Sequence, residues 1–252
     1  MARLRQAADQ ARGRGAPEVA ARCLRRALAE PPREAARVEV LFELGQIETM
    51  QDPAAAVSDL GEALAGSSAG PRQAAIALAL GEALTLAGRL GEAIPVFDRG
   101  LAQPTLEPSE LRASLEAGLL AAARWEPSAQ ELRRRTVNGI RRRDALGERI
   151  DPQLHSQLAI EAAAEGVDRA GAIRHARAAL AAAEQLTSSA SAVPESALVL
   201  TFAEPGRDGT RCAVVTRSPP ASSASPNWPR GGAPTTRSPS PCSSLPERWK
   251  RI

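Results

Sequence analysis

The chain of 252 residues carries a recurring arrangement of small and apolar positions. A small residue is followed four positions later by Leu or Phe, and three positions after that by another small residue. Because positions i, i+4 and i+7 lie on one face of an α-helix, each triplet predicts a helix with one buried stripe. The first residues of successive triplets are 36 and 37 positions apart, a period typical of helix-pair repeats. The triplets are Ala20/Leu24/Ala27, Ala56/Leu60/Ala63 and Ala93/Phe97/Gly100.

A further helix is predicted ahead of each later triplet, in the segments RVEVLFELGQIETM and RQAAIALALGEALTLAG. Asp52 and Asp151 each precede a proline, a pairing that predicts a helix N-cap followed by proline at the first helical position. Gly45 and Gly81 fall inside helices, where glycine costs about 0.5–1 kcal/mol relative to alanine. We expect these two glycines to mark close contacts between helices. A weaker triplet follows at Ala172/Ala176/Ala179.

Composition supports a helical interpretation throughout. The sequence has no Tyr, three Phe and three Trp, whereas Ala and Leu supply most of its 43% hydrophobic residues. Ala and Leu favour helices, and the residues that favour strands are scarce. The sequence therefore predicts an all-α array of about five helix pairs over residues 1–190. No apolar run approaches the roughly 20 residues of a membrane span, so no membrane partner is expected.

The residues at these positions resemble the tetratricopeptide repeat. Residues 80–104 carry most of the family pattern, residues 1–66 carry two shorter versions of it, and residues 108–187 match it weakly. The resemblance implies a helix-pair solenoid in which each pair buries its apolar face against its neighbours. The matching positions are Leu80-Gly81, Leu84, Gly88, Ala93, Phe97 and Pro104, then Leu44-Gly45, Ala56, Leu60 and Ala63, then Gly15, Ala20, Leu24, Ala27 and Pro32.

The same resemblance implies a concave groove, lined by the first helix of each pair, that holds a partner peptide. The alternative is that the implied positions are ordinary exposed residues of surface helices. In the second and third units these positions are Glu39, Phe42, Gln46, Thr49, Ala75, Leu78, Glu82 and Thr85.

Residues 1–200 also resemble, in phrasing such as GAPEVAARCLRRALAEPP and MQDPAAAVSDLGEAL, the helical-repeat region of large bacterial LuxR-type, MalT-like ATP-dependent regulators. That family places a nucleotide-binding domain before the repeats and a helix-turn-helix domain at the end. A phosphate-binding loop needs G-x-x-x-x-G-K-[ST], and Lys250, the sole lysine, follows no glycine loop. The resemblance therefore implies a fragment of such a regulator without its ATPase and DNA-binding parts.

Charge and composition change near residue 204. Residues 1–203 hold 24 arginines against 26 acidic residues, whereas residues 204–252 hold 8 basic residues against 3 acidic ones and many prolines and serines. Such a segment cannot bury enough apolar surface to offset its chain entropy, so residues 191–252 are predicted to be a disordered tail. The tail is either a proline-rich docking segment or a frame-shifted extension of the gene, and the second interpretation is favoured.

Candidate chemistry is sparse. His155 and His175 are twenty residues apart, and the three cysteines lack metal-ligand or redox spacing, so no metal or cofactor is expected. The segment RRRTVNGIRRRD predicts a basic stripe on one helix face, made of Arg134, Arg135, Arg141 and Arg142. Such a stripe suits phosphate contacts. Acidic neighbours and the absence of interleaved aromatic residues favour a solvated face instead, so direct nucleic-acid contact is not expected.

Together these observations predict a non-catalytic, cytoplasmic protein-interaction or signal-sensing module. Its partner would be a protein, a peptide or the flanking domains of a parent regulator. The alternative is a free-standing repeat adaptor that binds a partner peptide in its groove.

Overall fold

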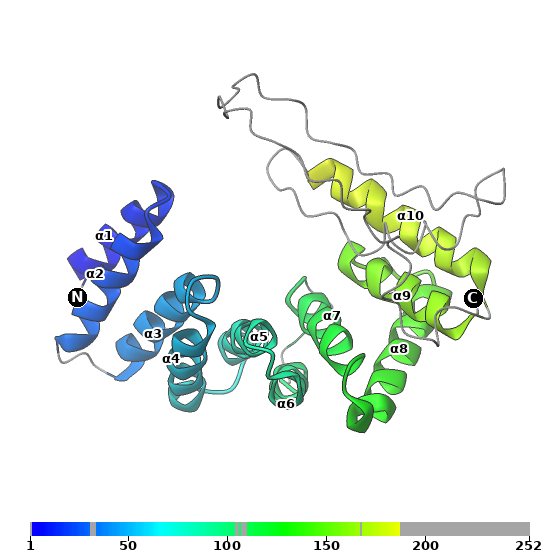
Figure 1. Ribbon diagram of the computed structural model, residues 1–252, viewed down its shortest axis with the longest axis horizontal. Coiled ribbons are helices and arrows are strands. Elements are labelled where there is room, and N and C mark those ends of the chain that lie inside the picture. The colour runs from blue at the N-terminus through cyan, green and yellow to red at the C-terminus, as the bar shows by residue number, and fades with distance from the viewer. Residues whose placement is uncertain (1, 31–33, 104–105, 107–109, 167, 187–252) are drawn as a thin grey trace, which may run out of the picture. The chain divides into compact units, whose positions relative to one another are not determined.

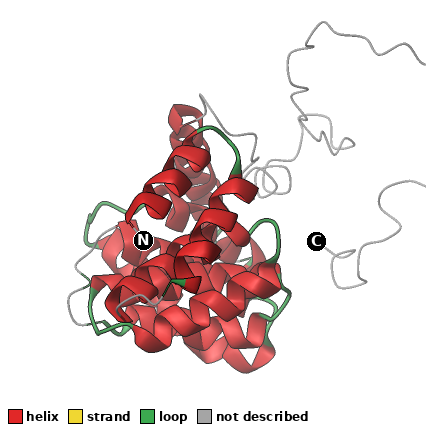
Figure 2. Cartoon of the chain, turned by 90° about the vertical axis from the view of Figure 1, so that its left-hand side faces the viewer, coloured by secondary structure: helices red, strands yellow, loops and turns green. Residues whose placement is uncertain are grey.

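The computed structural model describes residues 2–30, 34–103, 106, 110–166 and 168–186. Contacts separate the chain into two units, Met1–Ala213 and Val214–Ile252, and all described residues belong to the first. Within them the secondary structure is helical and contains no strand, which confirms the all-α prediction (Figures 1 and 2). The predicted tail, residues 191–252, lies outside the described residues.

The described helices follow one another with short turns between them. Each packs against the next along the chain, and the odd-numbered helices α3, α5, α7 and α9 also contact one another in sequence. They are α1 (Ala2–Gly13), α2 (Pro17–Ala29), α3 (Glu34–Glu48), α4 (Pro53–Gly66), α5 (Pro71–Leu86), α6 (Leu90–Leu101), α7 (Glu110–Ala123), a 3₁₀ turn (Pro127–Ala129), α8 (Gln130–Ala145), α9 (Pro152–Glu165) and α10 (Arg169–Leu186).

Helix starts follow the predicted chemistry. The Asp52 carboxylate accepts a hydrogen bond from the Ala55 backbone N–H at 3.1 Å, and Asp151 accepts one from Gln153 at 2.9 Å. Each bond satisfies an N–H group that the first turn of a helix leaves unpaired. Both predicted N-caps are therefore confirmed.

The predicted triplets form the buried stripes of α2, α4, α6 and α10. Ala20, Leu24 and Ala27 are at most 1% exposed, and the corresponding residues of the other triplets are equally or nearly as well buried. One apolar cluster runs from Val38 of α3 to Leu158 of α9, and a smaller one joins α1, α2 and α3. The helix-pair period read from the sequence thus gives the positions that pack.

The mid-helix glycines mark close approaches between helices, as expected. A Cβ atom added at Gly45 would lie 2.4 Å from Leu60, and one added at Gly81 would lie 2.4 Å from the ring of Phe97. Leu60 and Phe97 are the central residues of their triplets. Each glycine therefore makes room for the large side chain of the following helix.

Candidate functional site

Seven of the eight predicted groove residues lie on the odd-numbered helices α3 and α5, and Thr49 directly follows α3. Glu39 and Phe42 are engaged by a side chain of the next helix pair. The Arg72 side chain donates to the Glu39 carboxylate through Nε at 2.8 Å and through Nη2. The same guanidinium lies 4.3 Å from the ring centroid of Phe42, a cation–π distance. Phe42 is buried. Arg72 of α5 therefore covers this part of α3.

Two groove threonines repeat one local geometry. The Thr49 hydroxyl donates to the Gly45 carbonyl, and the Thr85 hydroxyl donates to the Gly81 carbonyl, each at 2.7 Å. At both places a helical glycine faces the next helix, and the threonine four residues later, directly after α3 or inside α5, bonds back to it. Both hydroxyl protons are thereby used within the chain.

The remaining groove residues are more available to a partner. Gln46 and Glu82 are exposed, while Ala75 and Leu78 are half-buried. The Glu82 side chain is exposed to solvent, but the surrounding protein removes part of its hydration shell. This partial desolvation raises the pKa of its carboxyl group. Among the described residues Glu82 has no hydrogen-bond or ion-pair partner.

A series of exposed apolar side chains continues these helix faces. Leu86 follows Glu82 by four residues and ends α5, so it lies one turn further along the same face. Met50 lies in the turn that follows α3. Both residues lie next to the connection between an odd-numbered helix and the even-numbered helix that follows it. We call the four exposed apolar residues at this end the turn edge: Val19 (40% exposed), Met50 (79%), Leu86 (54%) and Trp125 (74%).

The predicted basic stripe on α8 divides into paired and unpaired arginines. Arg134 forms an ion pair with Glu131 and Arg141 with Glu165, each at 2.8 Å. Arg135 and Arg142 have no ion-pair partner among the described residues. Two of the four arginines therefore have a carboxylate partner at the surface, and the other two carry their charge without one among the described residues.

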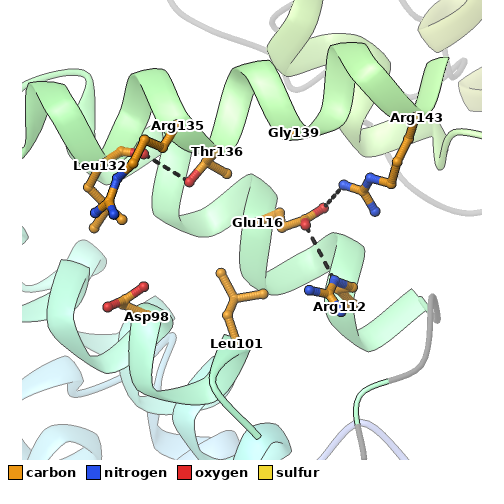
Figure 3. Close-up of a pocket in the computed structure, with 9 residues that line it drawn as sticks. All are labelled: Asp98, Leu101, Arg112, Glu116, Leu132, Arg135, Thr136, Gly139 and Arg143. Carbon is orange, nitrogen blue, oxygen red and sulfur yellow. Dashed lines mark hydrogen bonds and ion pairs between the residues drawn. The ribbon is translucent and has the colours of Figure 1, made fainter. Parts of the chain in front are cut away.

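A hollow of about 670 Å³ lies between α6, α7 and α8, and Arg135 lines it (Figure 3). The buried Glu116 carboxylate accepts from Arg143 at 2.6 Å and from Arg112 at 3.5 Å. Its charge is therefore balanced within the wall of the hollow. The lining residues are Asp98, Leu101, Arg112, Glu116, Leu132, Arg135, Thr136, Gly139 and Arg143.

The two histidines, which are twenty residues apart in the sequence, meet across α9 and α10. His155 Nδ1 and His175 Nδ1 lie 2.9 Å apart, and His175 is only 6% exposed. Their twenty-residue spacing spans a helix end, a turn and a helix start. No local periodicity relates positions across such a junction, so the contact between the two rings could not be predicted from their spacing.

The packing of α2, α3 and α4 also brings together two carboxyl groups, the buried Glu48 and the half-buried Asp59. Arg25 of α2 donates to Glu48 at 2.5 Å, and Glu48 is 2% exposed. Burial, followed by the charge of Asp59, raises the pKa of Glu48, although Arg25 opposes the shift. Burial likewise raises the pKa of Asp59. The two carboxyl groups therefore hold protons at a higher pH than they do in the unfolded chain.

This pair predicts a particular pH dependence for Asp59→Asn. A carboxyl group whose pKa is raised by folding stabilises the fold at low pH, and that contribution is lost as pH rises through the folded pKa. The neutral amide avoids the like charge, so the variant is expected to be more stable than the wild type at pH 7. The difference should shrink as pH falls toward the ordinary carboxyl range. Urea unfolding at several pH values measures it, and a gap that widens at low pH would contradict the assignment.

Within the described residues there is no group of three or more His, Cys, Asp or Glu side chains placed to hold a metal ion. None of the described helices combines the length and apolar character that crossing a membrane requires. Comparisons with protein-family models, with curated proteins and with solved structures give no match.

Proposed function

We propose that the chain is a non-catalytic docking module that holds a segment of a partner protein along the turn edge and the adjoining odd-helix faces. The observation that carries the proposal is the turn edge itself. Of the five large apolar side chains exposed in the described residues, four lie at the same end of successive helix pairs. Apolar side chains concentrated in one region mark interaction sites more often than the same number scattered singly.

The charges on this face favour an occupant with apolar side chains and one cationic group. Glu82 lies between the half-buried Leu78 and the exposed Leu86, each four residues away on α5. A carboxylate that is already partly desolvated loses less hydration when a cation binds it. We therefore propose a segment whose lysine or arginine pairs with Glu82 while apolar residues cover Leu86 and Trp125.

The family interpretation is part of the same proposal. A tetratricopeptide-type solenoid is supported by the contacts among odd-numbered helices and by the repeated Gly–Leu and Gly–Phe packing. The proposal that the chain is the repeat segment of a cytoplasmic LuxR-type regulator rests on the sequence resemblance alone. Gene context tests it: an upstream reading frame with a phosphate-binding loop is expected, and an isolated intact gene would leave the free-standing adaptor.

Peptide selection tests the docking proposal on the full chain. Short random peptides displayed on phage are selected against the wild-type protein, and the enriched sequences are synthesised and measured by fluorescence anisotropy. We expect apolar residues next to a lysine or arginine. Leu86→Ser and Trp125→Ser should each weaken binding by about tenfold or more, as loss of a central apolar contact does.

Leu146→Ser is the matched control, because Leu146 is 70% exposed but follows α8, at an even-to-odd turn. It should leave binding unchanged. Glu82→Gln should reduce the preference for cationic peptides and the sensitivity of binding to salt. If no peptide is enriched, or if the enriched peptides bind both edge variants as tightly as the wild type, the docking proposal is wrong.

A further inference from the structure

The His155–His175 contact has a geometry that admits one hydrogen between the rings. The ring centroids are 5.2 Å apart, and this distance exceeds the 2.9 Å between the Nδ1 atoms by about two imidazole ring radii. The centroids and the two nitrogens are therefore nearly in line, with the rings extending away from each other. A head-on arrangement at this distance is that of an N–H···N hydrogen bond.

The same geometry excludes a metal ion between these nitrogens. Two metal–nitrogen bonds of about 2.0–2.1 Å placed end to end need about 4 Å. The observed separation is 2.9 Å. The rings would have to turn before their lone pairs converged on a cation, so a proton is the species that fits.

The contacts of His175 Nε2 assign the donor. Arg174 Nη2, which can only donate, lies 3.3 Å from this nitrogen, and the Asp144 carboxylate lies 3.7 Å from it. The closer contact favours an unprotonated Nε2, which makes His175 Nδ1 the donor and His155 Nδ1 the acceptor. A first added proton goes to His175 Nε2, facing Asp144, and the N–H···N bond survives.

A second added proton can bind only at the Nδ1 atom of His155, which accepts the hydrogen bond. It would put hydrogens on both Nδ1 atoms, which then repel each other at 2.9 Å. We propose that the His155–His175 pair is a pH-sensitive joint: it holds α10 against α9 while the two rings share a hydrogen, and it releases α10 when both rings become imidazolium. This inference is independent of the docking proposal.

The apolar cluster beside the histidine pair, between α9 and α10, is small. The buried cluster between α9 and α10 consists of alanines alone, with Ile160 and Ala163 partly buried against it. Alanine allows the helices to approach closely but buries little area, and apolar burial stabilises by about 25 cal/mol per Å². The four alanines are Ala159, Ala162, Ala172 and Ala176. The histidine bond therefore adds a polar contact beside a small cluster of buried alanines.

Burial is the main cause that lowers the pKa of both histidines, and the charge of Arg174 lowers it further. Three carboxylates raise the histidine pKa values and so oppose this shift: Asp144 from α8, Asp151 at the start of α9 and Asp168 before α10. Folding that lowers a histidine pKa leaves the native state with fewer bound protons than the open state. The stability of the joint is therefore present above pH about 6.5 and is lost as pH falls below it.

Residue-resolved hydrogen exchange of the full chain between about pH 8 and pH 5 tests the inference, with rates corrected for the intrinsic effect of pH. The opening constant of α10 is expected to rise below pH about 6.5, by up to about tenfold per pH unit for each proton taken up. Helix α6, which contains neither a histidine nor a carboxyl group whose pKa is raised by folding, serves as the internal control and should not respond.

The double variant His155→Phe/His175→Leu should make the protection of α10 independent of pH over this range. If α10 is unprotected in that variant at every pH, nitrogen NMR of the wild-type histidines tests the inference instead. The shared hydrogen predicts opposite tautomers for the two rings at pH 8 and two separate protonation steps. The inference would be overturned if the two rings had identical tautomers and titrated independently. It would also be overturned if the protection of α10 in the wild type did not change with pH.

Discussion

Phe97→Ala is expected to lower the free energy of unfolding by about 3–5 kcal/mol, the cost typical of removing a buried phenylalanine ring. Phe97 is 1% exposed, and its ring comes from α6 to meet both neighbouring odd-numbered helices. Cβ atoms added at Gly81 of α5 and at Gly118 of α7 would lie 2.4 Å and 2.7 Å from that ring. Since domains are stable by only about 5–15 kcal/mol, this variant should lose a large share of its stability.

The fit around Phe97 can be tested further with a double-mutant cycle. Gly81→Ala in the wild type forces a methyl group into the ring and should cost about 1–3 kcal/mol. In the Phe97→Ala background the same change should be neutral or stabilising, because the ring is gone and alanine favours a helix by up to about 1 kcal/mol over glycine. The sign of the glycine substitution is therefore expected to reverse.

Gly61→Ala is the matched control, because Gly61 is also inside a helix but an added Cβ would meet nothing within 4 Å. It should stabilise the wild type slightly. Guanidinium unfolding followed by circular dichroism measures the four proteins of the cycle and the Gly61→Ala control. A Gly81→Ala cost that is the same with and without the Phe97 ring would show that the glycine does not make room for it.

Much of the fold was predictable because it depends on local periodicity. The buried triplets, the Asp52 and Asp151 caps and the contacts at Gly45 and Gly81 all follow from residues within one helix or one turn. Pro95 departs from the general tendency of proline to end helices, because it lies inside α6, on its exposed side. There the flanking apolar residues Ile94 and Phe97 are buried, and their packing outweighs the missing hydrogen bond.

The site was less predictable because its chemistry depends on how separate helices are aligned. The groove positions of α3 were predicted from the family resemblance, but a single helix does not reveal that Arg72 of α5 covers Phe42 and binds Glu39. The same holds for the histidine pair. Exposed apolar residues at the turn edge have a sequence signal, the shared spacing of 36 between Met50 and Leu86, but exposure itself required the structure.

Arg124→Met is expected to cost about 3 kcal/mol or more, because it leaves a buried carboxylate poorly compensated. Glu161 of α9 is 4% exposed, and its carboxylate lies 3.6 Å from Arg124 Nε and 3.6 Å from Arg133 Nη1. Arg124 also donates to Gln157 at 2.6 Å. The substitution therefore removes one of two charges facing Glu161 and one hydrogen bond, at the junction where α9 packs against α7 and α8.

The partner of Arg124 supplies the decisive comparison. Adding Glu161→Leu to Arg124→Met should restore most of the lost stability, because an apolar pair no longer buries an uncompensated charge. Arg134→Met is the control: its pair with Glu131 has side chains 70% and 63% exposed, and such pairs contribute at most about 1 kcal/mol. Urea unfolding of the full chain measures each variant. If Arg124→Met costs no more than Arg134→Met, the buried ion pair does not stabilise the α7–α9 junction. If adding Glu161→Leu lowers the stability further instead of restoring it, Arg124 stabilises the junction through its packing and its bond to Gln157.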